Sequence, residues 1–232
     1  MQQKKVLQSV TGLILALAMI LVILITSFQY AAYGDYSFYR KEYDKYDVYS
    51  EVHMEPKEVM KVTRTMMKYL IGKKKELSIT TVVDWKVQDF FNEQDRLHMA
   101  DVKNLFLGGL FLRRCCLVLM AICLGLLIRW KVDLKECLTR SWFLAVSVFF
   151  LILLVLGFLI SRDFTAVFTK FHELFFNNDL WLLDPETDYM IRILPEGFFL
   201  DMTLRIGKIF GAALLGVSAI CGLVRKISID YK

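Results

Sequence analysis

Histidine and proline are scarce in this sequence, which has three residues of each among its 232. The histidines do not form the H-E-x-x-H pattern of zinc hydrolases, because Phe176 stands four residues after His172. Cysteine is missing from both long polar segments and no C-x-x-C pair occurs, which excludes a disulfide, a thiol nucleophile or a zinc knuckle there. We therefore expect neither a metal nor a cofactor.

Charge is absent from several long runs, although charged residues make up 23% of the chain. Hydrophobic residues reach 56%, above the roughly 45–50% that is usual for globular domains. This composition excludes a disordered chain, a collagen-like repeat and a small disulfide scaffold. The net charge of +5 lies largely at the ends of apolar runs, where membrane lipid rather than nucleic acid is the expected partner.

Four apolar runs are long enough to cross a bilayer. The first has no charge from Val10 to Phe28 and would measure about 28 Å as a helix, close to the thickness of the hydrocarbon core. We expect an all-α integral membrane protein that forms a single membrane domain over residues 1–232. Its four transmembrane helices are predicted at about residues 8–30, 105–128, 141–160 and 203–224.

Positive charge on short flanks predicts the orientation of these helices. Putting the basic flanks inside makes both termini cytoplasmic and makes residues 31–104 and 161–202 extracytoplasmic. A cleaved signal peptide is the alternative at the N-terminus, but its apolar core would be shorter than this first run. The basic flanks comprise Lys4, Lys5, Arg129, Lys131, Lys135, Arg140, Arg225, Lys226 and Lys232.

The first polar segment predicts a mainly helical subdomain. It opens with an aromatic stretch, Phe28–Tyr49, expected to serve as an interfacial belt and as packing for the subdomain. Pro56 and Gly72 bracket a helical pattern of about 15 residues. Residues 77–83 are weakly extended in pattern, and helical spacing returns from about residue 89 and continues into the second span.

This last helix contains a histidine and a carboxylate that can share one face. His98 and Asp101 are three residues apart, and Arg96 lies on the same helix. A carboxylate beside an imidazole fixes its tautomer and raises its basicity, as general-base catalysis requires. A structural ion pair is the alternative interpretation of the same spacing.

The second polar segment is acidic, rich in aromatic residues and contains one histidine, His172. Asn177–Asp179 is typical of a turn or cap, and Asp184-Pro185 is typical of a helix start. Neither interpretation explains the presence of a histidine in this acidic, aromatic segment. Residues 171–188 read F-H-E-L-F-F-N-N-D-L-W-L-L-D-P-E-T-D.

Two motifs in these segments resemble those of the bacterial lipoprotein intramolecular transacylase family, four-span proteins of the plasma membrane. The first is His98 followed by D-V-K-N-L-F at residues 101–106, at the head of the second span. The second is the pattern F-H-E-x-x-F-x-N-D-x-W-x-x-D-P-x-T-D at 171–188, followed by L-P-E-x-F-F at 194–199. The length of the second motif makes the resemblance specific.

The resemblance implies an acyltransferase acting at the outer face of the bacterial plasma membrane. Its substrate is the diacylglyceryl-modified N-terminal cysteine of a lipoprotein, whose sn-2 acyl chain moves to its own α-amino group to give the lyso form. Such a transfer needs no enzyme nucleophile, which agrees with the missing cysteines. The family's two essential histidines correspond to His98 and His172.

The expected roles follow from the resemblance and from the side chains. His172 would take the amine proton while His98, oriented by Asp101, donates to the oxyanion or leaving oxygen, although the reverse assignment is equally open. Trp181 is expected to anchor its segment at the membrane interface rather than to contact substrate. The candidate supporting residues, any of which could instead be caps or ion-pair partners, are Asp101, Arg96, Glu173, Asn178, Asp179, Asp184 and Trp181.

Other classes of function remain open from the residues alone. A transporter would need charge at mid-membrane or paired repeats, and the first and third runs are uncharged. A non-catalytic scaffold or sensor that binds lipids or lipoproteins would tolerate loss of both histidines. A metal-dependent hydrolase is disfavoured by the small number of ligands.

Overall fold

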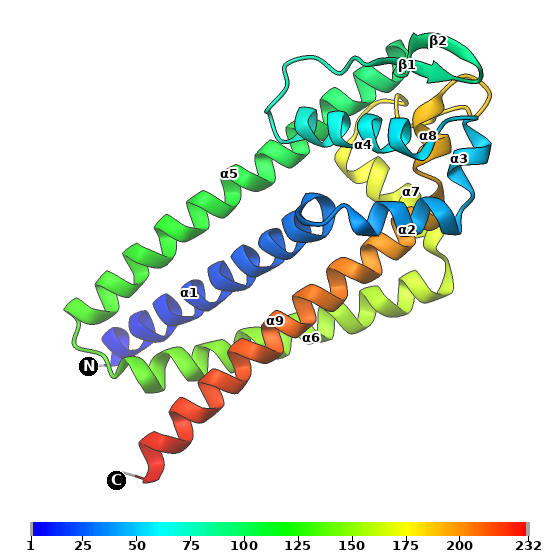
Figure 1. Ribbon diagram of the computed structural model, residues 1–232. Helices are drawn as coiled ribbons and strands as arrows, with labels where there is room; N and C mark the ends of the chain where they lie inside the picture. The colour runs from blue at the N-terminus through cyan, green and yellow to red at the C-terminus, as the bar shows by residue number, and fades with distance from the viewer. Residues whose placement is uncertain (1, 231–232) are drawn as a thin grey trace. The chain divides into compact units, whose positions relative to one another are not determined.

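The chain is predominantly helical, with one short hairpin, in a computed structural model that describes residues 2–230 (Figure 1). The elements in chain order are α1 (Gln2–Gln29), a π-helical turn (Tyr30–Gly34), α2 (Ser37–Lys45), α3 (Val48–Glu51), α4 (Pro56–Leu70), β1 (Thr80–Val83), β2 (Lys86–Asp89), α5 (Glu93–Arg129), α6 (Leu134–Arg162), α7 (Phe164–Phe175), α8 (Tyr189–Ile193) and α9 (Glu196–Asp230).

The chain divides into two compact units. The transmembrane unit comprises Met1–Gln29, Leu110–Arg162 and Arg205–Lys232, and the polar unit comprises Tyr30–Gly109 and Asp163–Leu204. Helices α1, α5, α6 and α9 are long and apolar enough to cross a membrane. The predicted all-α fold with four transmembrane helices is therefore confirmed, while the orientation of the termini stays a prediction.

Small residues bring α1 and α6 together in the transmembrane unit (Figure 1). A Cβ added at Gly12 would lie 2.6 Å from Ser141 Oγ and 2.8 Å from Cys137 Sγ. Gly12 and Ala16 on α1 are four residues apart, as are Ser141 and Ala145 on α6, the spacing at which membrane helices approach closely. This close approach forms one side of a buried apolar cluster comprising Ala16, Ile20, Trp142, Ala145, Phe210 and Leu214.

Aromatic side chains form the interior of the polar unit. Tyr39 and Tyr43 on α2 are buried, and both rings pack around Phe198 near the start of α9. Their hydroxyls are satisfied, because Tyr39 donates to Ala32 O at 2.7 Å and Tyr43 shares a 2.7 Å hydrogen bond with Thr63. These tyrosines therefore pack the subdomain.

Helix α4 has the bounds that its sequence predicts. Pro56 is its first residue, where a missing N–H costs nothing, and Gly72 follows its end with a positive φ of 77°. In the next segment β1 lies within the predicted extended residues 77–83, whereas β2 was not predicted. Strand β1 pairs with an antiparallel β2 through a two-residue turn at Asp84-Trp85, in which both residues have positive φ.

Two helix starts also differ from the prediction. Helix α5 begins at Glu93 because Asn92 and Asp95 cap it reciprocally: Asn92 N donates to Asp95 Oδ2 and Asp95 N donates to Asn92 Oδ1. The expected helix start at Asp184-Pro185 is wrong, and α8 begins at Tyr189. Asp188 accepts a 2.6 Å hydrogen bond from Asp184 N, which closes residues 184–188 into a turn.

Candidate active site

The two predicted histidines lie side by side in the polar unit. His98 comes from the first turns of α5 and His172 from the last turn of α7. Their ring centroids are 6.1 Å apart and their planes differ by 32°. Both side chains are buried, so two residues from separate polar segments of the chain form one titratable pair.

The tautomer of His172 is fixed by a backbone hydrogen bond. His172 Nδ1 lies 2.7 Å from Phe168 O, one helical turn earlier, and a carbonyl oxygen can only accept. Nδ1 therefore carries the proton, and Nε2 is left with its lone pair. The Trp181 ring stacks on the imidazole at 4.9 Å with an interplanar angle of 27°, and the Phe168 ring meets its edge at 4.3 Å.

His98 has a different environment. Its Nδ1 is buried and has no hydrogen-bond partner among the described residues. The Phe176 ring contacts it edge-on at 5.3 Å and also lies 5.7 Å from the His172 ring, so one phenylalanine borders both imidazoles. A buried ring nitrogen without a partner is rare in folded proteins and is available to a ligand.

The expected contact from Asp101 to His98 is absent in this structure. Asp101 Oδ2 instead accepts a 2.9 Å hydrogen bond from Asn178 Nδ2, while Asn178 Oδ1 accepts one from Leu180 N at 3.1 Å. Sharing a helix face allows a contact between residues three apart but does not require one. Asp101 and Asn178 together fasten the loop after α7 to α5, and so act on the two histidines through their supporting segments.

Burial keeps both imidazoles neutral. Desolvation, together with the nearby His172, lowers the pKa of His98 to about 4, and the charge of Asp101 opposes this shift only weakly. Desolvation also lowers the pKa of His172, while the Phe168 carbonyl acts in the opposite direction by stabilising the charged ring. At neutral pH the site thus holds two uncharged imidazoles.

The remaining candidate residues contact other groups. Arg96 pairs with Asp89 at 2.9 Å, and Glu173 pairs with Lys170 at 2.5 Å. Asp184 Oδ1 accepts from Glu186 N within the turn before α8. The carbonyl of Asp179 accepts from Leu182 N. In this structure all four of these residues support local geometry.

The contacts of Phe168, Phe176 and Trp181 with the histidines were not expected. Phe168 and Phe176 stand four residues before and after His172. Within a helix, this spacing brings side chains to one face. That spacing is the signal that could have identified them. Trp181, expected at the membrane interface, stacks on His172, and no local spacing predicts a contact made through a loop.

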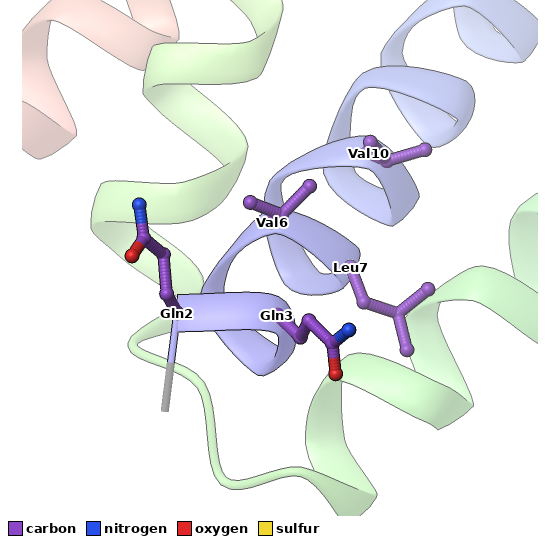
Figure 2. A pocket seen from close by; sticks show the side chains of 5 residues that line it. All are labelled: Gln2, Gln3, Val6, Leu7 and Val10. Atoms are coloured by element: carbon purple, nitrogen blue, oxygen red, sulfur yellow. The ribbon is translucent and has the colours of Figure 1, made fainter.

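No competing site is evident elsewhere in the described chain. Figure 2 shows a shallow hollow lined by five side chains from the start of α1, none of which ionises: Gln2, Gln3, Val6, Leu7 and Val10. The five cysteines are free and all belong to the transmembrane unit. Residues 2–230 contain no group of three or more side chains arranged to hold a metal ion.

The chain thus combines four helices that can span a membrane with a buried pair of neighbouring histidines, as in a membrane-integral protein. The family model of the lipoprotein intramolecular transacylase Lit matches residues 13–199. The chain therefore belongs to this family of acyltransferases. No curated protein matches the chain.

Solved structures of the membrane-integral lipoprotein intramolecular transacylase Lit from Bacillus cereus share the fold. One is 22% identical with a TM-score of 0.77 and covers 97% of each chain. A second, with a histidine-to-arginine substitution, is 20% identical with a TM-score of 0.78 and covers 100% of this chain and 97% of its own. A third, with a histidine-to-alanine substitution, is 22% identical with a TM-score of 0.74.

Proposed function

We propose that the histidine pair transfers the sn-2 acyl chain of a diacylglyceryl-modified lipoprotein cysteine to the α-amino group of that same cysteine. The observation that carries this proposal is the 6.1 Å separation of the His98 and His172 rings. A proton acceptor and a proton donor must each come within about 2.6–3.2 Å of the reacting group. Two rings at this spacing can both reach a single tetrahedral centre.

His172 is the better base of the two. Its Nε2 keeps a free lone pair because Nδ1 donates to Phe168 O, and that hydrogen bond strengthens as the ring gains a proton. The stacked Trp181 face also favours an imidazolium over a neutral ring. As the amine nitrogen attacks the ester carbonyl carbon, the new C–N bond forms and Nε2 takes the amine proton.

His98 suits the role of hydrogen-bond donor to the oxyanion. With a pKa of about 4 it stays neutral, and a neutral imidazole N–H can stabilise a developing oxyanion without first becoming charged. The oxyanion then collapses, the bond between the carbonyl carbon and the glycerol oxygen breaks, and that oxygen receives the proton held by His172. Both histidines return to their starting state, so no cofactor is consumed.

Positioning supplies much of the acceleration. Amine and ester belong to one substrate, and oriented intramolecular reactions reach effective molarities of about 10⁵–10⁸ M, worth roughly 7–11 kcal/mol. Such a reaction needs no acyl-enzyme.

The positive flanks of the four spans support an orientation in the plasma membrane with both termini cytoplasmic and the histidines on the extracytoplasmic side.

Tandem mass spectrometry of a reporter lipoprotein's N-terminal peptide tests the proposal, with fragmentation because the shift leaves the mass unchanged. His98→Ala and His172→Ala should each abolish the N-acylated lyso form in cells that still make the protein. His53→Ala is the matched control, since His53 pairs with Asp84 at 2.9 Å and its ring contacts Trp85 rather than His98 or His172. Normal product from either site variant would refute the scheme and support a scaffold that binds lipid without catalysis.

A further inference from the structure

The reacting ester imposes a constraint on the surface beside the histidines. If the proposed function holds, the carbonyl carbon that lies between His98 and His172 carries a long acyl chain bonded directly to it. That chain has to leave the site over the surface that adjoins the rings, and apolar surface accommodates it at least cost. The described residues around His172 therefore indicate the path of the acyl chain.

Helix α7 presents exposed apolar side chains next to His172. Phe171, Leu174 and Phe175 are 44%, 77% and 50% exposed, although large apolar side chains are normally buried. The Phe171 ring lies 5.6 Å from the His172 ring and 4.8 Å from the Phe175 ring. These three residues, here called the α7 stripe, are thus continuous with the histidine pair.

The order of the α7 stripe follows from helix geometry. At about 100° per residue, Phe175 lies about 60° from His172 around the helix, Phe171 about 100° and Leu174 about 160°, all on the same side. The other side is polar, because Lys170 pairs with Glu173 there. An apolar path therefore leads from His172 across Phe175 and Phe171 to Leu174 at its far edge.

A second exposed apolar area in the polar unit makes no such connection. Val82 and Val87 face each other across the hairpin, and Trp85 at its turn contacts the His53 ring at 5.8 Å. Both valines and Trp85 are exposed, like the α7 stripe. The ring contact of Trp85 leads to His53, which lies outside the candidate site.

We propose that the α7 stripe binds the acyl chain that is being transferred. The carbons nearest the ester contact Phe175 and Phe171, and only a chain of sufficient length reaches Leu174. Each methylene removed from water contributes a factor of about three to four in binding. The site would then select substrates by chain length through Leu174 while leaving the proton transfers to the histidines.

The test uses purified full-length protein and synthetic S-diacylglyceryl-cysteinyl peptides, one dipalmitoyl and one dihexanoyl. Leu174→Gln should lower kcat/KM about tenfold for the dipalmitoyl peptide and less than twofold for the dihexanoyl peptide. Val87→Gln is the matched control, because Val87 is 75% exposed on the hairpin and should leave both rates unchanged. Phe175→Ser repeats the test nearer the ester and should slow both substrates.

Each outcome decides between the two proposals. An equal loss on both substrates with Leu174→Gln, or no loss on the long one, overturns the acyl-chain assignment while the transacylase proposal stands. If Leu174→Gln slowed both substrates equally in bilayers but neither in detergent, the α7 stripe would be a membrane contact. That result would also overturn the acyl-chain assignment. A wild-type protein that forms no N-acyl product from either peptide overturns both proposals together.

Discussion

Different interactions stabilise the interior of each of the two units. In the transmembrane unit, Gly12 lets α1 approach Ser141 of α6, and a hydrogen bond from Trp142 Nε1 to Ser218 Oγ at 3.0 Å joins α6 to α9. In the polar unit, tyrosine and phenylalanine rings fill the interior, and the buried carboxylate of Asp95 caps α5. Lipid is as apolar as leucine, so membrane helices rely on close approach, whereas water drives rings inward in the polar unit.

The two units also differ in their buried titratable groups. A buried group whose pKa differs from its usual value couples protonation to packing, and the polar unit has such groups at Asp95, His98 and His172. Unit-specific unfolding can be followed by fluorescence in two reporter backgrounds with Trp→Phe substitutions, one that keeps Trp85 and Trp181 of the polar unit and one that keeps Trp130 and Trp142 of the transmembrane unit. Four substitutions test how far the two units differ.

The largest effect is expected from Asp95→Asn. Burial raises the pKa of Asp95 to about 7, so the folded state holds a proton that the unfolded chain has lost, and stability falls as pH rises from about 4 to 7. His98 acts oppositely, because its folded pKa of about 4 lies below the unfolded 6.5 and its contribution is lost as pH falls. His172, whose pKa burial also lowers, acts in the same direction as His98. The wild-type profile should therefore be shallower than that of a variant that lacks Asp95. In Asp95→Asn the free energy of unfolding should rise by about 3 kcal/mol between pH 4 and 6.5.

The matched variant is His98→Leu, which removes the opposing group. Relative to the wild type, its polar unit should become less stable as pH rises over the same range. The double variant should keep only the rise in stability with pH that His172 causes. Urea unfolding at a series of pH values, followed through Trp85 and Trp181, measures all three slopes. A steep wild-type profile, or one that neither substitution alters, would show that these two buried groups do not control the stability of the polar unit.

A smaller loss is expected from Gly12→Val in the transmembrane unit. The new side chain would enter the space of Ser141 Oγ and Cys137 Sγ and push α1 from α6, which should cost about 1–3 kcal/mol and lower the thermal midpoint reported by Trp142. Gly157→Val is the control, because no atom lies within 4 Å of its added Cβ. Equal losses for the two variants would remove small-residue packing as the distinction between the units.

Sequence patterns predicted the transmembrane unit better than the polar unit. Uncharged runs specify helices in lipid, where every backbone group has to be paired internally. Helix α4 was equally predictable, because Pro56 and Gly72 mark its ends by backbone chemistry alone. Strand β2 was missed because Val87 and its neighbours show no alternation of burial: the first two residues of the strand are exposed and the last two half-buried.

The candidate site was predictable only in part. The resemblance in two motifs identified His98 and His172, but nothing local to either residue indicates that their rings meet. The hydrogen bond from Asn178 to Asp101 joins residues far apart in the chain, so it took the place of the expected contact between Asp101 and His98. Local spacing defines which side chains share a face, and tertiary packing decides which of them pair.

The smallest effect is expected from Gly197→Ala in the polar unit, where rings rather than small residues set the packing. The added Cβ would lie 2.5 Å from Tyr46 Oη, which donates a 2.7 Å hydrogen bond to Asp201 Oδ2. Displacing the tyrosine should cost about 1 kcal/mol, the net value of one such bond. Gly108→Ala, with no atom within 4 Å of its Cβ, should be neutral or slightly stabilising in the same fluorescence assay. If Gly197→Ala proved as costly as Gly12→Val, close backbone approach would matter equally in both units, and the contrast between them would rest on their titratable groups alone.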